Sequence, residues 1–232
     1  MSDTPLDGAA ILDSVVAFIR RFVVLTDSQL IVIALWVAHS HAPEAVDITP
    51  FLAINSAEKR CGKTKLLEVL KLLVRNPWLT GRVTAAVLIR KVHAECPTLL
   101  LDESDAAFAG NKEYSEALRG VLNSGHSRDG LASCCVGQGS NITYQDFRTF
   151  CCKAIAGIGR LPDTVADRSI PIRLKRRAPN EKVARFRQRE ARTSALELHD
   201  HLAAWAKNNL EILRDLRPAL PDALSDRQQD GA

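Results

Sequence analysis

The feature that most constrains the fold is a short apolar run, Phe51–Ile54, followed by a polar loop and a leucine-rich stretch that begins at Lys63. A continuous apolar run of this length is typical of a buried strand, and the leucines after it recur at helical spacing up to Arg75, just before Pro77. A strand, a tight loop and a helix in this order gather backbone N–H groups at the positive end of the helix. The sequence therefore predicts an anion-binding loop between this strand and this helix.

The loop is close to the phosphate-binding pattern G-x-x-x-x-G-K-[ST], with alanine in place of the first glycine. Its residues are Ala57, Glu58, Lys59, Arg60, Cys61, Gly62, Lys63 and Thr64. In this pattern the second glycine lets the backbone approach the phosphates, the lysine reaches the β- and γ-phosphates, and the last hydroxyl binds Mg²⁺. The alternative is a chance match at a lysine-rich helix start, which the strand–loop–helix context disfavours. We expect all eight residues to contact ATP, with Lys63 also acting in catalysis and Thr64 as a Mg²⁺ ligand.

A second apolar run, Thr98–Leu101, ends in two acids, Asp102 and Glu103. In proteins with a phosphate loop, an aspartate at this position holds Mg²⁺, usually through water, and we expect this role for Asp102. The neighbouring carboxylate points in another direction and can take a proton from the attacking water, so Glu103 is the expected general base. Alone, such a pair often only caps the following helix. Asp105, three residues beyond Asp102, is expected to be a helix cap or a solvated acid.

A third candidate site lies between residues 160 and 173, where basic residues follow a late apolar run. In ring-forming NTPases, an arginine of a neighbouring subunit neutralises charge in the transition state. Arg168 is our first candidate for that catalytic role, and Arg160 is our second. The alternative interpretation is a structural arginine that pairs with Asp163 or Asp167.

The order of apolar runs and turn residues predicts alternating strands and helices, and so an α/β fold with a mostly parallel central sheet. The expected strands cover residues 51–54, 98–101, 153–158 and 169–174. The expected helices cover residues 11–24, 28–40, 63–75, 84–94, 113–124 and 181–216. A β-hairpin is expected from residues 131–136 and 142–147, which flank the turn-rich Gly137–Asn141.

These elements group into four segments along the chain. We expect an N-terminal helical segment over residues 1–45, a P-loop NTPase core over 46–178, a C-terminal helical segment over 179–218 and a disordered tail over 219–232. The hairpin is an insertion in the core. The expected architecture is therefore a P-loop core with flanking N- and C-terminal helices.

Composition excludes several other classes of protein. An apolar content of 46% and a charged content of 25% are typical of a soluble globular protein. The longest strongly apolar run, Leu30–Ala38, is too short to span a bilayer, and the N-terminus lacks a signal-peptide pattern, so we expect a cytoplasmic protein with no membrane segment. The six cysteines have no C-x-x-C spacing, which favours reduced, buried thiols over a zinc site.

The net charge of +4 is unevenly distributed along the chain. Residues 160–192 hold eleven Lys or Arg and four Asp or Glu. A basic stretch of this kind attracts nucleic acid through its phosphates, independently of base sequence. It is equally typical of a solvated helix face, and the sequence leaves the two interpretations open.

Four blocks of the sequence together resemble an uncharacterised prokaryotic P-loop ATPase domain of phage, prophage and plasmid primase-helicase-like proteins. The blocks are residues 56–65, 99–105, 118–125 and 161–170, and the resemblance extends over residues 10–205. It implies a core of the AAA+ or superfamily-three helicase type that works as a homo-oligomeric ring on single-stranded DNA, with separate primase or replication proteins as partners. Position by position, it assigns Lys63 and Thr64 to the phosphate loop, Asp102 and Glu103 to the metal and water site, and Arg168 to a possible arginine finger.

Two departures from the family pattern keep the functional alternatives open. The hairpin tip, residues 138–141, has no Lys or Arg with which to contact DNA, and the run Ala154–Gly159 lacks the polar sensor residue of many AAA+ proteins. The leading hypothesis is an ATP-driven DNA motor or replication-initiation ATPase. The main alternative is a nucleotide-dependent regulatory or interaction module without unwinding activity. A small-molecule kinase is a third class, which the acidic pair after the second strand and the lack of an evident substrate lid disfavour.

Overall fold

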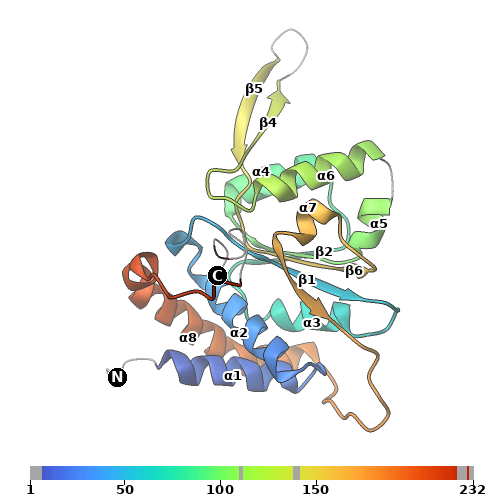
Figure 1. Ribbon diagram of the computed structural model, residues 1–232, viewed down its shortest axis with the longest axis vertical. Coiled ribbons are helices and arrows are strands. Elements are labelled where there is room, and N and C mark those ends of the chain that lie inside the picture. The colour runs from blue at the N-terminus through green and yellow to red at the C-terminus, as the bar shows by residue number, and fades with distance from the viewer. Residues whose placement is uncertain (1–6, 110–111, 138–141, 224–228, 230–232) are drawn as a thin grey trace.

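The computed structural model describes residues 7–109, 112–137, 142–223 and residue 229. At its centre lies a five-stranded sheet in the order β2-β3-β6-β1-β7, in which all described pairings are parallel (Figure 1). The strands are β1 (Phe51–Ser56), β2 (Pro77–Thr80), β3 (Thr98–Leu101), β6 (Lys153–Ile158) and β7 (Ser169–Arg173). The expected α/β fold with a mostly parallel central sheet is confirmed. The strand β6 lies between β1 and β3, although it comes last of the three in the chain.

Helices cover both faces of the sheet (Figure 1). On one face lie α1 (Gly8–Arg20), α2 (Asp27–His41), α3 (Lys63–Leu70) and α8 (Gln188–Asp215). On the other lie α4 (Ala85–Glu95), α5 (Ser104–Ala109), α6 (Lys112–Ser124) and α7 (Asp163–Ala166). Among the helices of the described ranges, none has the length and apolar character that a membrane span requires.

The strands bury both of their faces because successive side chains point to opposite sides of the sheet. In β1, Leu52 and Ile54 join the apolar cluster formed with α1, α2, α3 and α8, whereas Phe51 and Ala53 join the cluster formed with α4, α6 and α7. A strand buried on both sides has to be apolar throughout, which explains the continuous apolar runs in the sequence.

The N-terminal and C-terminal helices share a core with the sheet. The helix α8 packs along α1 and α2 (Figure 1). The start of α2 is fixed by a capping box, in which the Thr26 hydroxyl accepts from the Gln29 N–H and the Gln29 side chain accepts from the Thr26 N–H. After α2, a short 3₁₀ turn, η1 (Pro43–Ala45), leads to β1, and the Trp36 indole N–H donates to the Pro50 carbonyl oxygen at 2.9 Å.

The expected hairpin is present as β4 (Leu131–Val136) and β5 (Thr143–Arg148), which pair antiparallel. It projects away from the rest of the molecule (Figure 1). Its base is fixed by the buried Phe147 and by a hydrogen bond from the Arg148 N–H to His93 Nδ1 at 3.0 Å. The expectation about the tip falls on residues 138–141, which lie outside the described part of the chain, and so does most of the expected tail.

Three helices are shorter than the sequence predicts. The first ends at Arg20 instead of residue 24, and α3 ends at Leu70 instead of Arg75, where i→i+3 bonds tighten the chain before it turns into β2. Residues 181–187 are not helical, because the Ala184 N–H donates to the Arg21 carbonyl oxygen at 2.7 Å and tertiary contacts hold this segment against α1. The strand β2 was not predicted, since it begins at Pro77, which an edge strand tolerates.

Gly125, directly after α6, is enclosed by backbone atoms and a buried lysine. Lys153 is fully buried, and its Nζ donates to the carbonyl oxygens of Gly125 at 2.7 Å and Cys151 at 2.8 Å. A Cβ atom at Gly125 would lie 2.3 Å from the Thr149 carbonyl oxygen and 2.6 Å from Lys153 Nζ. We expect Gly125→Ala to lower the free energy of unfolding by about 2–3 kcal/mol, because an added methyl group in a packed site forces its neighbours apart.

Urea denaturation followed by circular dichroism measures this effect. Gly120→Ala is the matched control, because Gly120 lies inside α6 and a Cβ there meets no atom within 4 Å. Alanine favours a helix over glycine, so this control is expected to be neutral or to stabilise by up to about 1 kcal/mol. Equal stability of Gly125→Ala and the wild type would contradict the close packing around Gly125.

Two histidines of α2 make the stability depend on pH. Burial lowers the pKa of both His39 and His41 to about 4. His41 Nε2–H donates to the Leu73 carbonyl oxygen at 2.7 Å, and His39 Nε2 lies 2.8 Å from the Thr49 hydroxyl. In the unfolded chain a histidine has a pKa of about 6.5, so between pH 6.5 and 4 the unfolded state binds protons that the folded state excludes.

The free energy of unfolding is therefore expected to fall as the pH drops from 7 to 5, by about 2 kcal/mol per histidine. Urea denaturation at several pH values measures the slope. In the double variant His39→Gln/His41→Gln, the free energy of unfolding is expected to depend much less on pH over the same range. A wild type with the same stability at pH 7 and pH 5 would contradict the burial of these rings as neutral groups.

Candidate functional site

Parallel strands bring their carboxyl ends to one edge of the sheet, and most of the predicted site residues lie there. The loop after β1 begins with Ala57, the end of β3 is followed by Asp102 and Glu103, and the end of β6 is followed by Gly159. Because β6 lies between β1 and β3, the β1 loop and the β3 acids are brought together from strands that do not pair. Open α/β sheets bind their ligands outside this edge.

The loop between β1 and α3, with the first two residues of α3, is called here the 57–64 loop. Its backbone turns twice through the left-handed region, at Arg60 (φ 63°) and Gly62 (φ 90°). Such turns direct backbone N–H groups to the concave side of a loop. Gly62 forms the N-cap of α3, and a Cβ there would approach only Val23 Cγ1, at 4.0 Å. The requirement for glycine therefore comes from the backbone conformation at Gly62 and not from crowding.

Lys63 is held by groups of its own loop. Its Nζ donates to Ser56 Oγ at 2.7 Å and to the Glu58 carbonyl oxygen at 3.3 Å, and the Ser56 hydroxyl in turn donates to the same carbonyl oxygen at 2.6 Å. The ammonium group thus lies over the concave side of the loop, with weak neutral acceptors. An anion bound in the loop would be a stronger acceptor for this group.

Thr64 and Asp102 meet across the sheet edge. The Thr64 hydroxyl donates to Asp102 Oδ2 at 2.7 Å, and the Asp102 N–H donates to the Thr80 carbonyl oxygen at 2.8 Å, which fixes the acid beside β2. A hydroxyl and a carboxylate are the hard oxygen ligands that Mg²⁺ uses, together with waters and substrate phosphates. The pair therefore fits a Mg²⁺ ion that is completed by a nucleotide.

Glu103 follows in a strained conformation. Its φ is 53°, in the left-handed region that non-glycine residues rarely adopt, and its N–H donates to Asp102 Oδ1 at 2.9 Å. Its side chain is exposed at the same edge of the sheet. Strain of this kind persists where the surrounding structure enforces it, and it is frequent at functional sites.

The remaining loop residues differ in exposure. Ala57, Glu58, Lys59 and Arg60 are exposed, so their backbone and side chains are accessible to a ligand. Cys61 is buried and belongs to the cluster with α1 and α2, so its side chain anchors the loop to the core.

Arg168 lies at the opposite edge of the sheet. It directly precedes β7, its carbonyl oxygen accepts from the Phe51 N–H at the start of β1, and its guanidinium donates to the Thr164 carbonyl oxygen at 2.7 Å. It therefore does not join Lys63, Thr64 and Asp102 of its own chain. His126 also lies at this far edge, where its Nδ1–H donates to the Thr49 carbonyl oxygen.

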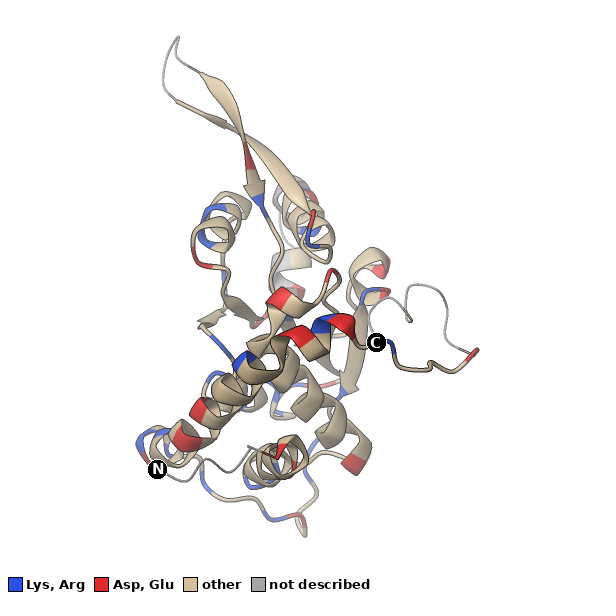
Figure 2. Ribbon diagram, turned by 90° about the vertical axis from the view of Figure 1, so that its left-hand side faces the viewer, with Lys and Arg blue, Asp and Glu red and all other residues tan. Residues whose placement is uncertain are grey.

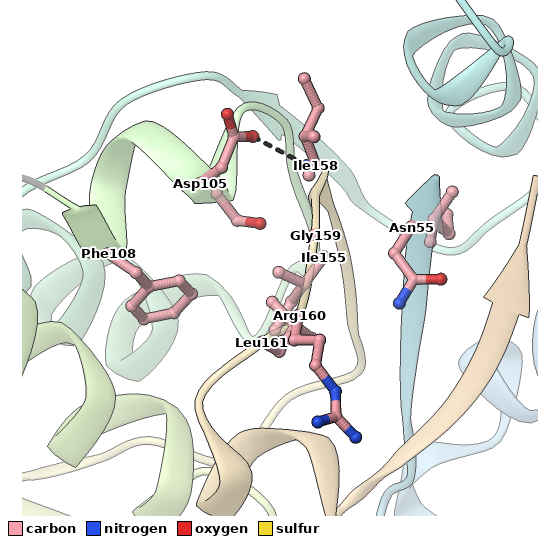
Figure 3. Close-up of a pocket in the computed structure, with 11 residues that line it drawn as sticks. Asn55, Asp105, Phe108, Ile155, Ile158, Gly159, Arg160 and Leu161 are labelled. Atoms are coloured by element: carbon pink, nitrogen blue, oxygen red, sulfur yellow. Dashed lines mark hydrogen bonds between the residues drawn. The ribbon is translucent and has the colours of Figure 1, made fainter. Parts of the chain in front are cut away.

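A cavity of about 290 Å³ lies between α5 and the carboxyl ends of β1 and β6, on the face of the sheet opposite α3. Its polar lining comes from Asn55 at the end of β1, from Ser104 and Asp105 at the start of α5, and from Arg160 after β6 (Figure 3). Asp105 was expected to be a helix cap or a solvated acid, but its Oδ1 accepts from the Ile158 N–H at 3.0 Å and ties α5 to β6. Sequence reasoning left Asp105 outside the site, although it follows the acidic pair by two residues.

Within the basic segment 160–192, residues 174–187 form an extended strap between β7 and α8. Its exposed cations are Lys175, Arg176, Arg177, Lys182, Arg185 and Arg187. Figure 2 shows Lys and Arg positions in the loops at the end of the molecule away from the hairpin. Phe186 anchors the strap, with its ring 5.1 Å from the ring of Phe22 and 4.3 Å from Lys65 Nζ. The strap therefore lies beside the start of α3.

Comparisons with known proteins find a family match over part of the chain and a set of similar solved structures. A family model described as "Protein of unknown function (DUF3631)" matches residues 173–231, which include the strap and α8 but not the 57–64 loop. No curated protein matches the chain. The similar solved structures include "The A form apo structure of NrS-1 C terminal region-CTR" at 14% identity with a TM-score of 0.45, and "The apo structure of NrS-1 C terminal region (305-718)" at 14% identity with a TM-score of 0.46.

These two structures are covered only in part. The alignments include 100% of this chain but 51% and 52% of the NrS-1 chains, so this chain has about half their length. Similarity at these TM-scores does not carry a functional conclusion. The function proposed below therefore rests on the geometry at the sheet edge.

Proposed function

We propose that this chain is a P-loop ATPase, which binds ATP with Mg²⁺ at the 57–64 loop and hydrolyses it. The observation that carries the proposal is the meeting of Lys63, Thr64 and Asp102 at one sheet edge, with the Thr64 hydroxyl 2.7 Å from the Asp102 carboxylate. A phosphate loop needs a cation and a hydroxyl at the start of one helix, together with an acid from another strand. Chance similarity in the loop sequence would not place the acid of a non-adjacent strand at hydrogen-bond distance from the hydroxyl.

Each residue has a distinct role in the proposed site. The N–H groups of the loop and the positive end of α3 bind the phosphates, and Lys63 leaves the Glu58 carbonyl oxygen for a phosphate oxygen. Thr64 and Asp102 hold Mg²⁺, whose contribution is to neutralise charge on the phosphates. Glu103 accepts a proton from the water that attacks the γ-phosphate.

The far-edge position of Arg168 favours a role in a second subunit. Arg168 is half-buried, and a guanidinium that cannot reach its own 57–64 loop can still complete the site of a neighbour in a ring. We therefore propose a homo-oligomer in which Arg168 acts in trans.

The strap supports nucleic acid as the second ligand. Several exposed cations on an extended segment attract the phosphates of a nucleic acid. This attraction depends neither on base sequence nor on an exact spacing of the charges. Its anchor, Phe186, contacts Lys65, which is only two residues beyond Lys63. Binding of single-stranded DNA to the strap is thereby coupled to the start of α3, as a DNA-stimulated ATPase or replication helicase requires.

Calorimetric titration with ATP tests the binding step. The wild type is expected to bind ATP more tightly with Mg²⁺ than without it. Thr64→Val keeps the volume of the side chain but removes the hydroxyl, and it is expected to abolish this Mg²⁺-dependent gain while weaker binding remains. A gain of equal size in Thr64→Val would exclude Thr64 as a ligand, and a wild type that binds no ATP would overturn the proposed function.

The hairpin favours a second candidate, a nucleotide-dependent interaction module without unwinding activity. On one face of the hairpin, Leu131, Ile142 and Tyr144 are 53%, 62% and 77% exposed, and in the described strands the only Lys or Arg is Arg148 at the base. Exposed apolar side chains on a projecting element are typical of a protein interface. An unwinding assay, combined with light scattering with and without ATP, separates the candidates: a motor unwinds a forked duplex and assembles on DNA, whereas a module changes only its assembly state.

A further inference from the structure

The cavity at the carboxyl ends of β1 and β6 is lined by an arginine that the fold itself does not use. Arg160 lies directly after β6, at the carboxyl edge of the sheet. Among the described residues its guanidinium has no hydrogen bond or ion pair, and in Figure 3 it extends away from Asp105, on the side of the cavity that Asn55 borders. A cation without a partner at a proposed phosphate site is available to the ligand.

The backbone on the N-terminal side of Arg160 is firmly positioned. The Gly159 N–H donates to the Ser56 carbonyl oxygen at 3.2 Å, and the Ser56 hydroxyl accepts from Lys63 Nζ at 2.7 Å. One residue earlier, the Ile158 N–H donates to Asp105 Oδ1 at 3.0 Å. Gly159, which precedes Arg160, is thus hydrogen-bonded to Ser56, the residue that also holds Lys63. The long side chain of Arg160 is left free to move.

The cavity is also built to hold a polar occupant. The Ser104 residue is 1% exposed, and its hydroxyl has no hydrogen-bond partner among the described residues. It packs against Gly157, where a Cβ would lie only 2.3 Å from Ser104 Oγ. Buried hydroxyls are almost always hydrogen-bonded, so this one indicates a water molecule or ligand oxygen in the cavity. A side chain at Gly157 would close this space.

We propose that Arg160 is a catalytic residue acting in cis, which binds the terminal phosphate of ATP from the cavity side, and that Asp105 is the residue that positions it. This inference rests on the proposed ATPase function. In the step it assists, the oxygen of a water molecule forms a bond to the γ-phosphorus, the bond from that phosphorus to the β–γ bridging oxygen breaks, and Glu103 accepts the proton. ADP and inorganic phosphate are the products, and Arg160 neutralises charge that builds up on the γ-phosphate oxygens.

Two arginines then serve one site from different subunits. Arg160 belongs to the chain that binds the nucleotide, whereas Arg168 comes from its neighbour. The two assignments differ in a measurable way. If an arginine that acts in cis is removed, a neighbouring subunit that still has this arginine cannot restore ATP turnover at the altered site.

Steady-state ATP turnover and ATP affinity of the full chain test the role of Arg160. Arg160→Ala is expected to lower turnover by about 10²–10³-fold with ATP affinity changed by less than about threefold, and Arg160→Lys is expected to recover part of the rate. Arg214→Ala, an exposed arginine near the end of α8, is the matched control and is expected to behave as the wild type. Unchanged turnover in Arg160→Ala would overturn the proposal.

Asp105 variants test the positioning role. Asp105→Asn keeps an oxygen that can accept from the Ile158 N–H, so it is expected to retain most of the turnover, whereas Asp105→Ala loses the acceptor and is expected to lower it by about tenfold or more. Loss of turnover in Asp105→Asn with normal folding would show that the charge of Asp105 is required, and it would overturn a purely positioning role.

Mixing of variants distinguishes cis from trans action. Arg160→Ala chains mixed with Glu103→Gln chains are expected to stay inactive, because neither kind of site has both Arg160 and Glu103. Recovered turnover in this mixture would show that Arg160 is supplied by a neighbour and would overturn the cis assignment. A wild type without any ATP turnover is a separate outcome, which would overturn the proposed function and this inference with it.

Discussion

Replacing Glu103 by glutamine is expected to lower ATP turnover by about 10²–10⁴-fold, the usual contribution of a general base. Glutamine keeps the size of the side chain but cannot accept the proton of the attacking water. The residue already adopts a left-handed backbone conformation, with φ of 53°, which glutamine tolerates no worse than glutamate. ATP affinity is therefore expected to stay within a few-fold of the wild type, or to appear tighter because bound ATP is no longer consumed.

Turnover and equilibrium ATP binding, measured on the same preparations, separate the two effects. Glu197→Gln changes an exposed residue of α8, on the face of the sheet opposite the cavity. It is the matched control and is expected to have wild-type turnover. Full turnover in Glu103→Gln would mean that another group takes the proton. In that case Asp105 would be the next candidate, because its carboxylate borders the cavity.

Arg168→Ala is expected to lower turnover by about 10³-fold, the lower end of what an arginine finger contributes. The lost turnover is expected to return in part when a second variant is added. In a mixture with Glu103→Gln chains, which supply an intact Arg168, sites of the Arg168→Ala chains regain their missing arginine and turnover returns in part. This behaviour follows from the position of Arg168 at the amino edge of the sheet, away from its own 57–64 loop.

Two results would contradict the trans role of Arg168. If the mixture stays inactive while light scattering shows mixed oligomers, Arg168 does not act across an interface. If Arg168→Ala instead unfolds more easily, the hydrogen bond from its guanidinium to the Thr164 carbonyl oxygen is a structural one. Thermal unfolding of the variant distinguishes this second case, since a catalytic arginine can be removed without loss of stability.

Much of the fold was predictable because it depends on local pattern. The apolar run of β6 was predicted with its observed bounds, Lys153–Ile158, since a strand buried on both faces leaves a continuous apolar signal. The hairpin was predicted within one residue at each strand, because Gly137 and the polar residues after it mark the turn. Both signals lie within a few residues of the structure that they specify.

Other elements could not be predicted because tertiary contacts decide them. The strap has a sequence compatible with a helix, but the Ala184 N–H bonds to the Arg21 carbonyl oxygen and Phe186 packs on Phe22. The strand β2 is short and begins with proline, so it has no alternating pattern of its own and depends on pairing with β3. The helices α5 and α7 are too short to show a helical period.

The candidate site also has one part that local sequence patterns predict and one part that depends on the tertiary fold. The sequence motifs pointed to Lys63, Thr64, Asp102 and Glu103, because each motif is a local strand end, and the structure places all four at one edge. The cavity beside them depends on the order of strands in the sheet. No sequence pattern shows that β6 inserts between β1 and β3, and only this insertion brings Gly159, the residue before Arg160, to Ser56.

The central claim is that the 57–64 loop binds and hydrolyses ATP. The most direct test is ATP turnover by the wild type and Lys63→Ala in the presence of Mg²⁺, with and without single-stranded DNA. The wild type is expected to hydrolyse ATP faster when DNA is present, and Lys63→Ala is expected to lose about 10²-fold or more of the rate under both conditions. A wild type without Mg²⁺-dependent turnover, or a Lys63→Ala variant as active as the wild type, would contradict the assignment.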